Sequence, residues 1–208
     1  MSDPYPTVDG QAQAGRVIVL YGGAGRKQEL ARPHPVGLWQ PPVAGDQFGY
    51  AADALEDVGQ GGTPDPDAYA VAIGAPGTNV GGDDDAGWVG FLVAVDGGNV
   101  LMEATQVQVF PVAHLEAESS YAQNSPGTPR GVDAGDKFGT TLAFMAGASE
   151  RALIIGVPDD VDNSNGMVNI IPLGGGTPRY WAPGVNLVPA GGASRFGGAP
   201  ASVNGGSR

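Results

Sequence analysis

The sequence contains no cysteine among its 208 residues, which excludes disulfides, thiolate zinc sites and cysteine nucleophiles. It is also poor in positive charge, with 10 lysines and arginines against 22 aspartates and glutamates and a formal net charge of −12. An acidic chain without a Lys/Arg cluster repels nucleic-acid phosphates, so we expect no nucleic-acid binding. No apolar run approaches the roughly 20 residues that a membrane helix needs. We therefore expect no membrane span, and no signal peptide is visible.

Recognised catalytic patterns are missing as well. The sequence has no Gly-x-Ser-x-Gly, no His-Glu-x-x-His and no phosphate-cradling glycine loop. Its two histidines, His34 and His114, lie in proline-flanked or loop-like stretches without a partner motif. Paired carboxylates are abundant, but any acidic chain offers them. We therefore expect no catalytic residues, and we interpret His114 as a surface residue.

Glycine and proline, in contrast, are abundant, at 36 and 18 residues. Hydrophobic residues still make up 41% of the chain. They gather in short runs such as RVIVLY, WVGFLVAV, ATQVQVF and ALIIGV. A disordered chain lacks such runs, so the glycines and prolines indicate turns between many short strands. The pattern predicts an all-β fold, with residues 113–123 as the one helical candidate.

Two markers recur along the chain. Gly-Asp-x-Phe-Gly stands at 45–49 and 135–139, each followed by an apolar run that ends in Gly-x-Pro. A third Phe-Gly follows at 196–197. The recurring residues are Phe48, Gly49, Gly74, Pro76, Phe138, Gly139, Gly156, Pro158, Phe196 and Gly197. Recurrence of the same two short motifs in the same order indicates a repeat architecture.

Each repeat reads as four strands. In the first repeat we expect strands near 48–55, 68–74, 87–95 and 104–110. In the second we expect them near 138–145, 151–157, 166–172 and 177–182. The stretches 15–21 and 35–40 look like the last two strands of an earlier unit, and 196–203 like the first strand of a later one.

These markers resemble the FG-GAP repeat, the blade unit of integrin α-subunit-like β-propellers that is also found in many bacterial extracellular proteins. The resemblance covers about residues 3–203, and the second repeat has Gly-Val-Pro where the family has Gly-Ala-Pro. It implies four-stranded antiparallel blades, arranged as an incomplete β-propeller with about two full blades. The implied segments are 1–44 (partial blade), 45–111 (blade), 112–134 (polar insert or linker), 135–190 (blade) and 191–208 (first strand of a further blade, and tail).

The markers make physical sense as architecture. The phenylalanine can pack between adjacent sheets, and the glycine after it allows a close approach or a positive φ. Gly-x-Pro can end the second strand, because proline lacks the N–H that continues a ladder.

The resemblance also implies a Ca2+ loop between the first two strands of a blade. In the first repeat that loop offers Asp57, Asp65 and Asp67, although their spacing departs from the family pattern, and the second loop has no aspartate. Two further acidic clusters, 83–85 and 159–163, suit either a cation or Asx turns, and we favour turns.

As to function, the resemblance implies a secreted, extracellular binding or scaffold module, of the kind used in cell adhesion, that engages a protein or glycan through its loops. The alternatives are a structural piece that completes a larger or oligomeric propeller, and a propeller domain accessory to a hydrolase. The 112–134 insert suits a binding loop and a neutral excursion equally. Because fewer than three blades are expected, we also expect self-association or a partner chain that completes the propeller.

Overall fold

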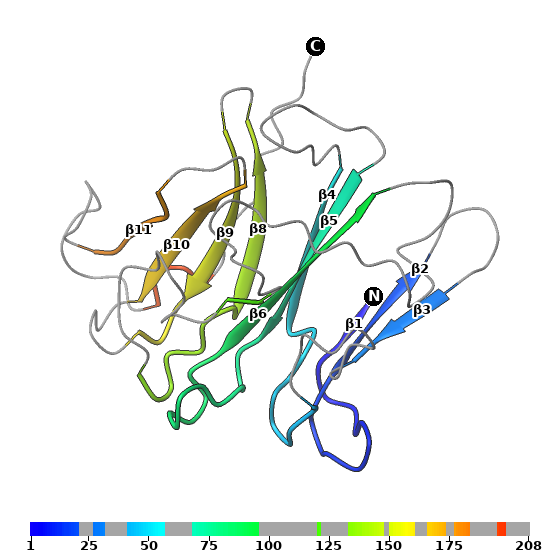
Figure 1. Cartoon of the computed structure of the whole chain (residues 1–208). Coiled ribbons are helices and arrows are strands. Elements are labelled where there is room, and N and C mark those ends of the chain that lie inside the picture. Colours follow the sequence, from blue (N-terminus) through cyan, green and yellow to red (C-terminus); the bar gives the residue numbers. More distant parts are fainter. Residues whose placement is uncertain are drawn as a thin grey trace.

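The computed structural model describes residues 1–20, 27–31, 41–56, 68–95, 120–121, 133–147, 150–160, 166–173, 177–183 and 195–198. Within these residues the chain is all-β, with three antiparallel sheets and no helix (Figure 1). The predicted fold class is therefore confirmed at this level.

The N-terminal sheet has the order β1-β2-β3 and comprises β1 (Ser2–Asp3), β2 (Arg16–Leu20) and β3 (Lys27–Leu30). The strand predicted at 15–21 is thus present as β2. Its partner on one side is β3, with Val17 opposite Leu30. The strand expected at 35–40 lies outside the described residues. The strand that pairs with β2 is β3, a segment that the sequence pattern did not predict as a strand.

The middle sheet has the order β4-β5-β6-β7. Its strands are β4 (Ala51–Glu56), β5 (Ala68–Ala75), β6 (Trp88–Val95) and β7 (Ser120–Tyr121). The first three match the predicted strands closely, and β5 ends directly before Pro76. The expected fourth strand, 104–110, lies outside the described residues. Residues 120–121, which we expected within a polar insert with helical character, instead pair with β6 as β7.

The C-terminal sheet has the order β11-β10-β9-β8. Its strands are β8 (Thr141–Ala146), β9 (Arg151–Val157), β10 (Met167–Pro172) and β11 (Arg179–Trp181). All four fall inside or within one residue of the predicted ranges. The inner strand β10 is buried along its whole length, which explains why its residues are apolar on both faces of the sheet, with Asn169 as the exception.

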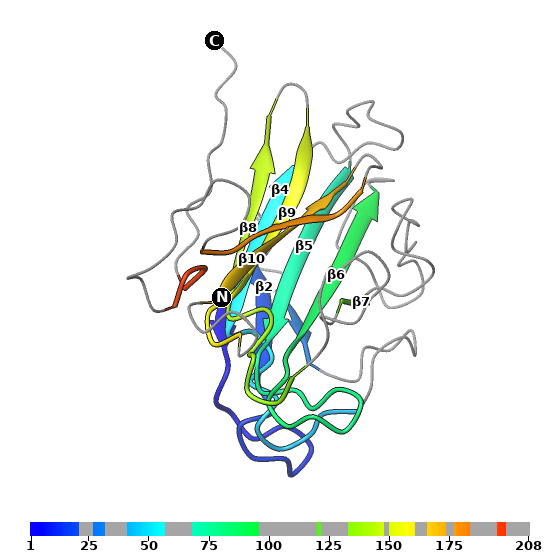
Figure 2. The ribbon, with the colours of Figure 1, turned by 90° about the vertical axis from the view of Figure 1, so that its left-hand side faces the viewer.

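The described sheets form an open row, in which the edge strands β4 and β8 of neighbouring sheets lie side by side (Figures 1 and 2). A large core cluster fills the space between the middle and C-terminal sheets and contains the fully buried Phe138. A smaller one joins the N-terminal and middle sheets around Phe48, which is also fully buried. Burying a phenylalanine side chain contributes about 1.5–3 kcal/mol, so Phe48 and Phe138 are each a main anchor between two sheets.

Candidate functional site

The Gly-Asp-x-Phe-Gly segments form the joints between sheets. We call residues 43–49 the first arm, 133–139 the second arm and 195–198 the third arm. In the first arm the buried Asp46 carboxylate accepts a hydrogen bond from the Val43 N–H at 2.8 Å. In the second, the buried Asp136 carboxylate accepts one from the Asp133 N–H at 3.0 Å. The aspartate of the motif therefore holds the first and second arms in the same turn.

Each of these two arms donates main-chain hydrogen bonds to a loop of the previous sheet, the loop before β2 in the N-terminal sheet and the loop before β6 in the middle sheet. In the first joint these bonds are Gly45 N–H to Ala12 O (2.9 Å), Gln47 N–H to Gln13 O (2.9 Å) and Phe48 N–H to Ala14 O (2.9 Å). In the second they are Gly135 N–H to Asp84 O (2.8 Å), Lys137 N–H to Asp85 O (3.0 Å) and Phe138 N–H to Ala86 O (2.9 Å). The second joint thus repeats the first, bond for bond.

A glycine at the end of each receiving loop makes this approach possible. Gly87 has φ +91°, and a Cβ there would lie less than 3.0 Å from main-chain atoms of Phe138. A Cβ at Gly15 would likewise lie less than 3.0 Å from main-chain atoms of Phe48, and a Cβ at Gly166 less than 3.0 Å from the main-chain oxygen of Phe196. The third arm therefore approaches the C-terminal sheet at the position where the earlier arms approach theirs, and this close contact between a glycine and a phenylalanine main chain occurs three times.

The residue before each marker phenylalanine has a left-handed backbone conformation. The φ angles are +56° at Gln47, +58° at Lys137 and +72° at Arg195. Such angles are uncommon for residues other than glycine. The turn shape, rather than the side chain, is thus what the repeats share at this position, and the side chain is free to differ.

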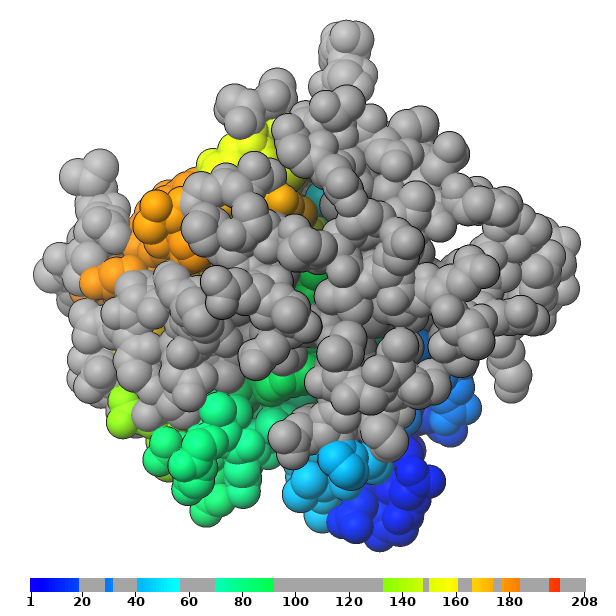
Figure 3. Space-filling model, viewed as in Figure 1, coloured from blue at the N-terminus to red at the C-terminus, as the bar shows by residue number. Residues whose placement is uncertain are grey.

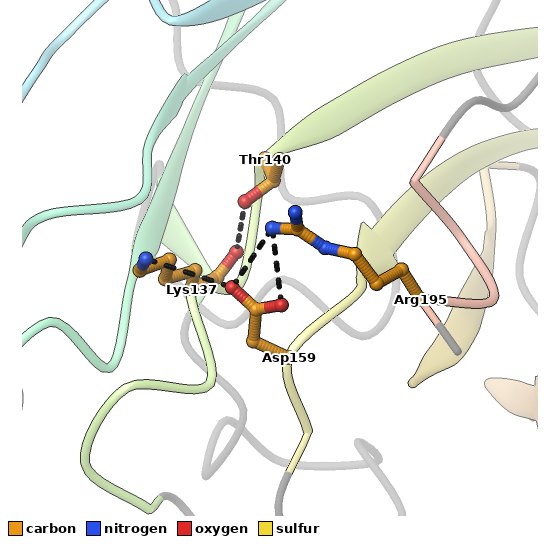
Figure 4. A network of polar contacts seen from close by, with 4 residues as sticks. All are labelled: Lys137, Thr140, Asp159 and Arg195. Atoms are coloured by element: carbon orange, nitrogen blue, oxygen red, sulfur yellow. Dashed lines mark hydrogen bonds and ion pairs between the residues drawn. The ribbon is translucent and has the colours of Figure 1, made fainter. Parts of the chain in front are cut away.

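In the second and third arms this side chain is cationic, and both cations reach one carboxylate (Figure 4). Asp159 lies 3.5 Å from the Lys137 ammonium and 3.1 Å from the Arg195 guanidinium. The Thr140 hydroxyl donates a hydrogen bond of 2.7 Å to the Lys137 carbonyl and fixes the second arm beside this pair. Asp159 therefore links two successive arms electrostatically.

The corresponding place in the middle sheet carries no charge. Asp159 directly follows Pro158, whereas Gly77 directly follows Pro76. The Gly77 N–H donates to the Asp46 carbonyl, and a Cβ at Gly77 would collide with the Gly45 carbonyl. An acidic side chain is thus sterically excluded at the middle sheet and present at the C-terminal sheet.

The predicted calcium ligands Asp57, Asp65 and Asp67 lie outside the described residues, as do His34 and His114. Over the part of the chain that the structure describes, no group of three or more acidic or histidine side chains is arranged to hold a metal ion. Sequence analysis did not identify the Asp159 pairs. The signal that could have found them is the alignment of the markers, which places an acid after Pro158 and a base before Phe196.

The acidic cluster 83–85 is a turn. The Asn79 side chain accepts a hydrogen bond from the Asp85 N–H at 3.0 Å and donates one to the Asp84 carboxylate at 2.7 Å. The carbonyls of the same two aspartates receive the second arm. These residues therefore shape a receiving loop, in line with the turn interpretation of this cluster.

The first and second arms and the loops that receive them gather at one end of the molecule, the lower end in Figures 1 and 3. Asp9, Asp84 and Asp85 are exposed there, and Val43 exposes 51% of its surface. This end is thus acidic and rigidly built, because its loops are bonded to one another. We call it the loop face.

Between the edge strands β4 and β8, the Asp53 carboxylate accepts a hydrogen bond of 2.7 Å from the Phe144 N–H. A main-chain donor at a sheet edge would otherwise have no strand partner. Asp53 therefore satisfies the edge of β8 and links the middle and C-terminal sheets a second time, away from the arms.

The outer edge of the C-terminal sheet carries an ion pair. The Arg179 guanidinium donates two hydrogen bonds to the Glu150 carboxylate, at 2.7 and 2.6 Å. These bonds hold the pKa of Glu150 below its ordinary value and raise that of Arg179. In the inner strand β10 of the same sheet, Asn169 is fully buried, and its amide nitrogen and oxygen have no hydrogen-bond partner among the described residues.

Neither the scan against protein-family models nor the search of curated proteins finds a match to this chain. Among the described residues, no helix is long and apolar enough to cross a membrane.

Proposed function

We propose that this chain is a non-catalytic binding or scaffold module of the FG-GAP, integrin-like β-propeller type, in which each sheet is one blade. The observation that carries the proposal is the threefold recurrence of one close contact, made by the main chains of Phe48, Phe138 and Phe196 with Gly15, Gly87 and Gly166. The first two contacts also share the same main-chain hydrogen bonds. Sheets joined in the same way would each be rotated by a similar angle relative to the last, as stacking around a common axis requires.

The loop face is the proposed binding surface for a protein or glycan. Its loops are held by main-chain bonds within and between sheets, so a partner meets a surface that is already ordered and the entropic cost of binding is small. Its exposed aspartates Asp84 and Asp85 favour a partner with basic groups or hydroxyl donors.

Charge reversal on this surface tests the proposal. The chain is immobilised and screened against a glycan array and a secreted-protein fraction, and every hit is re-measured with purified ligand. Asp84→Lys is expected to weaken binding at least severalfold through lost electrostatic complementarity. The matched control is Glu56→Lys, the same charge change on an exposed residue at the far end of β4. Equal binding by both variants would contradict a role for the loop face.

Calcium is tested separately. The resemblance assigns any ion to Asp57, Asp65 and Asp67. A thermal shift in about 1 mM Ca2+, which is lost in the triple Asp→Asn variant, is the expected result for an extracellular-type site. No shift and no heat of binding would remove calcium from the proposal and leave the scaffold function in place.

A second candidate function is that of a structural piece that completes a larger or oligomeric propeller. The observation that favours it is the open row of sheets, because a propeller typically has four to eight blades and the described chain shows three sheets. Sedimentation equilibrium of the 208-residue chain distinguishes the two functions. More than one chain per particle supports completion of a ring, and a compact monomer that binds a ligand supports the first function alone.

A further inference from the structure

The third arm docks on the C-terminal sheet through a full set of contacts. Phe196 packs, half-buried, against a cluster that includes Ala152, Val168 and Ile170. The Gly197 carbonyl accepts a hydrogen bond from the Thr141 hydroxyl. Gly166 leaves room for the main chain of Phe196. We call these residues of the C-terminal sheet, together with Asp159, the third-arm docking surface.

Charge matches this docking surface to this arm. The Arg195 guanidinium lies 3.1 Å from one Asp159 oxygen and 3.2 Å from the other, so one donor spans the whole carboxylate. The first arm has the neutral Gln47 at the same position. A shared backbone turn would let any arm dock on any receiving loop, and the Asp159–Arg195 pair is the feature that distinguishes the third arm from the first.

We infer that the third-arm docking surface also takes the third arm of a second copy of this chain, in competition with the chain's own arm. Every contact described above is between the arm and the sheet, so an arm from another copy makes the same contacts. Exchange of an identical element between copies is a low-cost route to association, and the balance is set by effective concentration rather than by new contacts. The inference deepens the proposed scaffold function and rests on it, because exchange would join the blades of two copies.

A reciprocal charge swap tests the exchange with the full-length chain. In Asp159→Arg and in Arg195→Asp, the chain's own arm and docking surface carry like charges. When the two variants are mixed, each arm meets an opposite charge only on the other copy. The mixture is incubated with mild warming, which allows local opening. One chain of each mixture is uniformly labelled with 15N, so that the two chains differ in mass. Native mass spectrometry then counts particles that contain one copy of each.

The expected result is an excess of mixed particles over a control mixture. The control combines the wild type with the double variant Asp159→Arg/Arg195→Asp, in which every chain matches itself and mismatches the other. Solvent-exposed ion pairs are modest, so each pair is expected to change the ratio by up to about fivefold. Adding Phe196→Ala to both single variants should abolish the excess, because it removes the apolar anchor of the arm.

An equal yield of mixed particles in the test and control mixtures would overturn the exchange. An excess that survives Phe196→Ala would also overturn it, because the contact would then lie elsewhere. Neither result bears on ligand binding at the loop face, which is measured with the wild-type chain. Failure of the exchange and failure of the proposed binding function are therefore distinguishable.

Discussion

Replacement of Gly87 by alanine probes the joint between the middle and C-terminal sheets most directly. Two effects add at this position. The φ angle of +91° lies in the left-handed region, where an L side chain costs roughly 1–2 kcal/mol. The new Cβ would also come within 3.0 Å of main-chain nitrogen and oxygen of Phe138. These main-chain atoms cannot move away as the end of a flexible side chain can. Overpacking of this kind typically lowers the free energy of unfolding by about 1–3 kcal/mol.

We therefore expect Gly87→Ala to lower the free energy of unfolding by about 2–5 kcal/mol, a large part of the 5–15 kcal/mol typical of a folded domain. Urea denaturation, followed by tryptophan fluorescence and far-UV circular dichroism, measures the change. The matched control is Gly135→Ala in the second arm. Gly135 has φ +84°, but a Cβ there would meet nothing within 4 Å. It should cost only the conformational part, roughly 1–2 kcal/mol.

The difference between the two variants isolates the close approach of the joint. If both lose the same stability, the collision with Phe138 does not occur and the joint geometry described above is wrong. If Gly135→Ala lowers the free energy of unfolding more than Gly87→Ala does, the backbone conformation of the second arm matters more than the close contact at the receiving loop.

Three further predictions concern single side chains. Asn169→Leu should raise the free energy of unfolding by about 1–3 kcal/mol in urea titrations, because it removes a buried amide that has no hydrogen-bond partner in the described part of the chain; a loss of stability would show that the amide is satisfied. Asp136→Ala should lower it by about 1–3 kcal/mol, because the Asp133 N–H loses its acceptor; a neutral effect in the same titration would deny the carboxylate a role in shaping the arm. Arg179→Ala should cost about 0.2–1 kcal/mol at neutral pH. That cost should fade as the pH drops through the lowered pKa of Glu150, below its ordinary 4.5, because the ion pair exists only while Glu150 is charged. A cost independent of pH would contradict this assignment.

The strands that the sequence predicts well are those with a strong local signature. The stretches that form β5, β9 and β10 are rich in apolar residues and bounded by glycine or proline, so composition and punctuation agree on their limits. The strand β3 has the sequence KQEL, which carries no such signature. It is a strand because β2 offers it an edge, and a tertiary effect of this kind leaves no trace in the local pattern.

The site was harder to predict than the strands. The phenylalanines and glycines of the markers stand out by repetition, whereas the network of Lys137, Asp159 and Arg195 joins residues that are far apart in the sequence. Each of these side chains alone reads as ordinary surface charge. Their meeting follows from the register of three arms along one row of sheets, which becomes visible only when the joint itself is known.

When each sheet packs only against the next one in the row, the sheets need not unfold together, because the stability of each depends on its own contacts and on those with its neighbours. Counted over the described residues, the apolar cluster that attaches the N-terminal sheet is smaller than the one between the other two sheets. Nearest-neighbour architectures lose their weakest terminal unit first. On heating or under mechanical force, the N-terminal sheet (β1 to β3) should accordingly unfold while the middle and C-terminal sheets stay folded. A protease should then cleave the N-terminal sheet first.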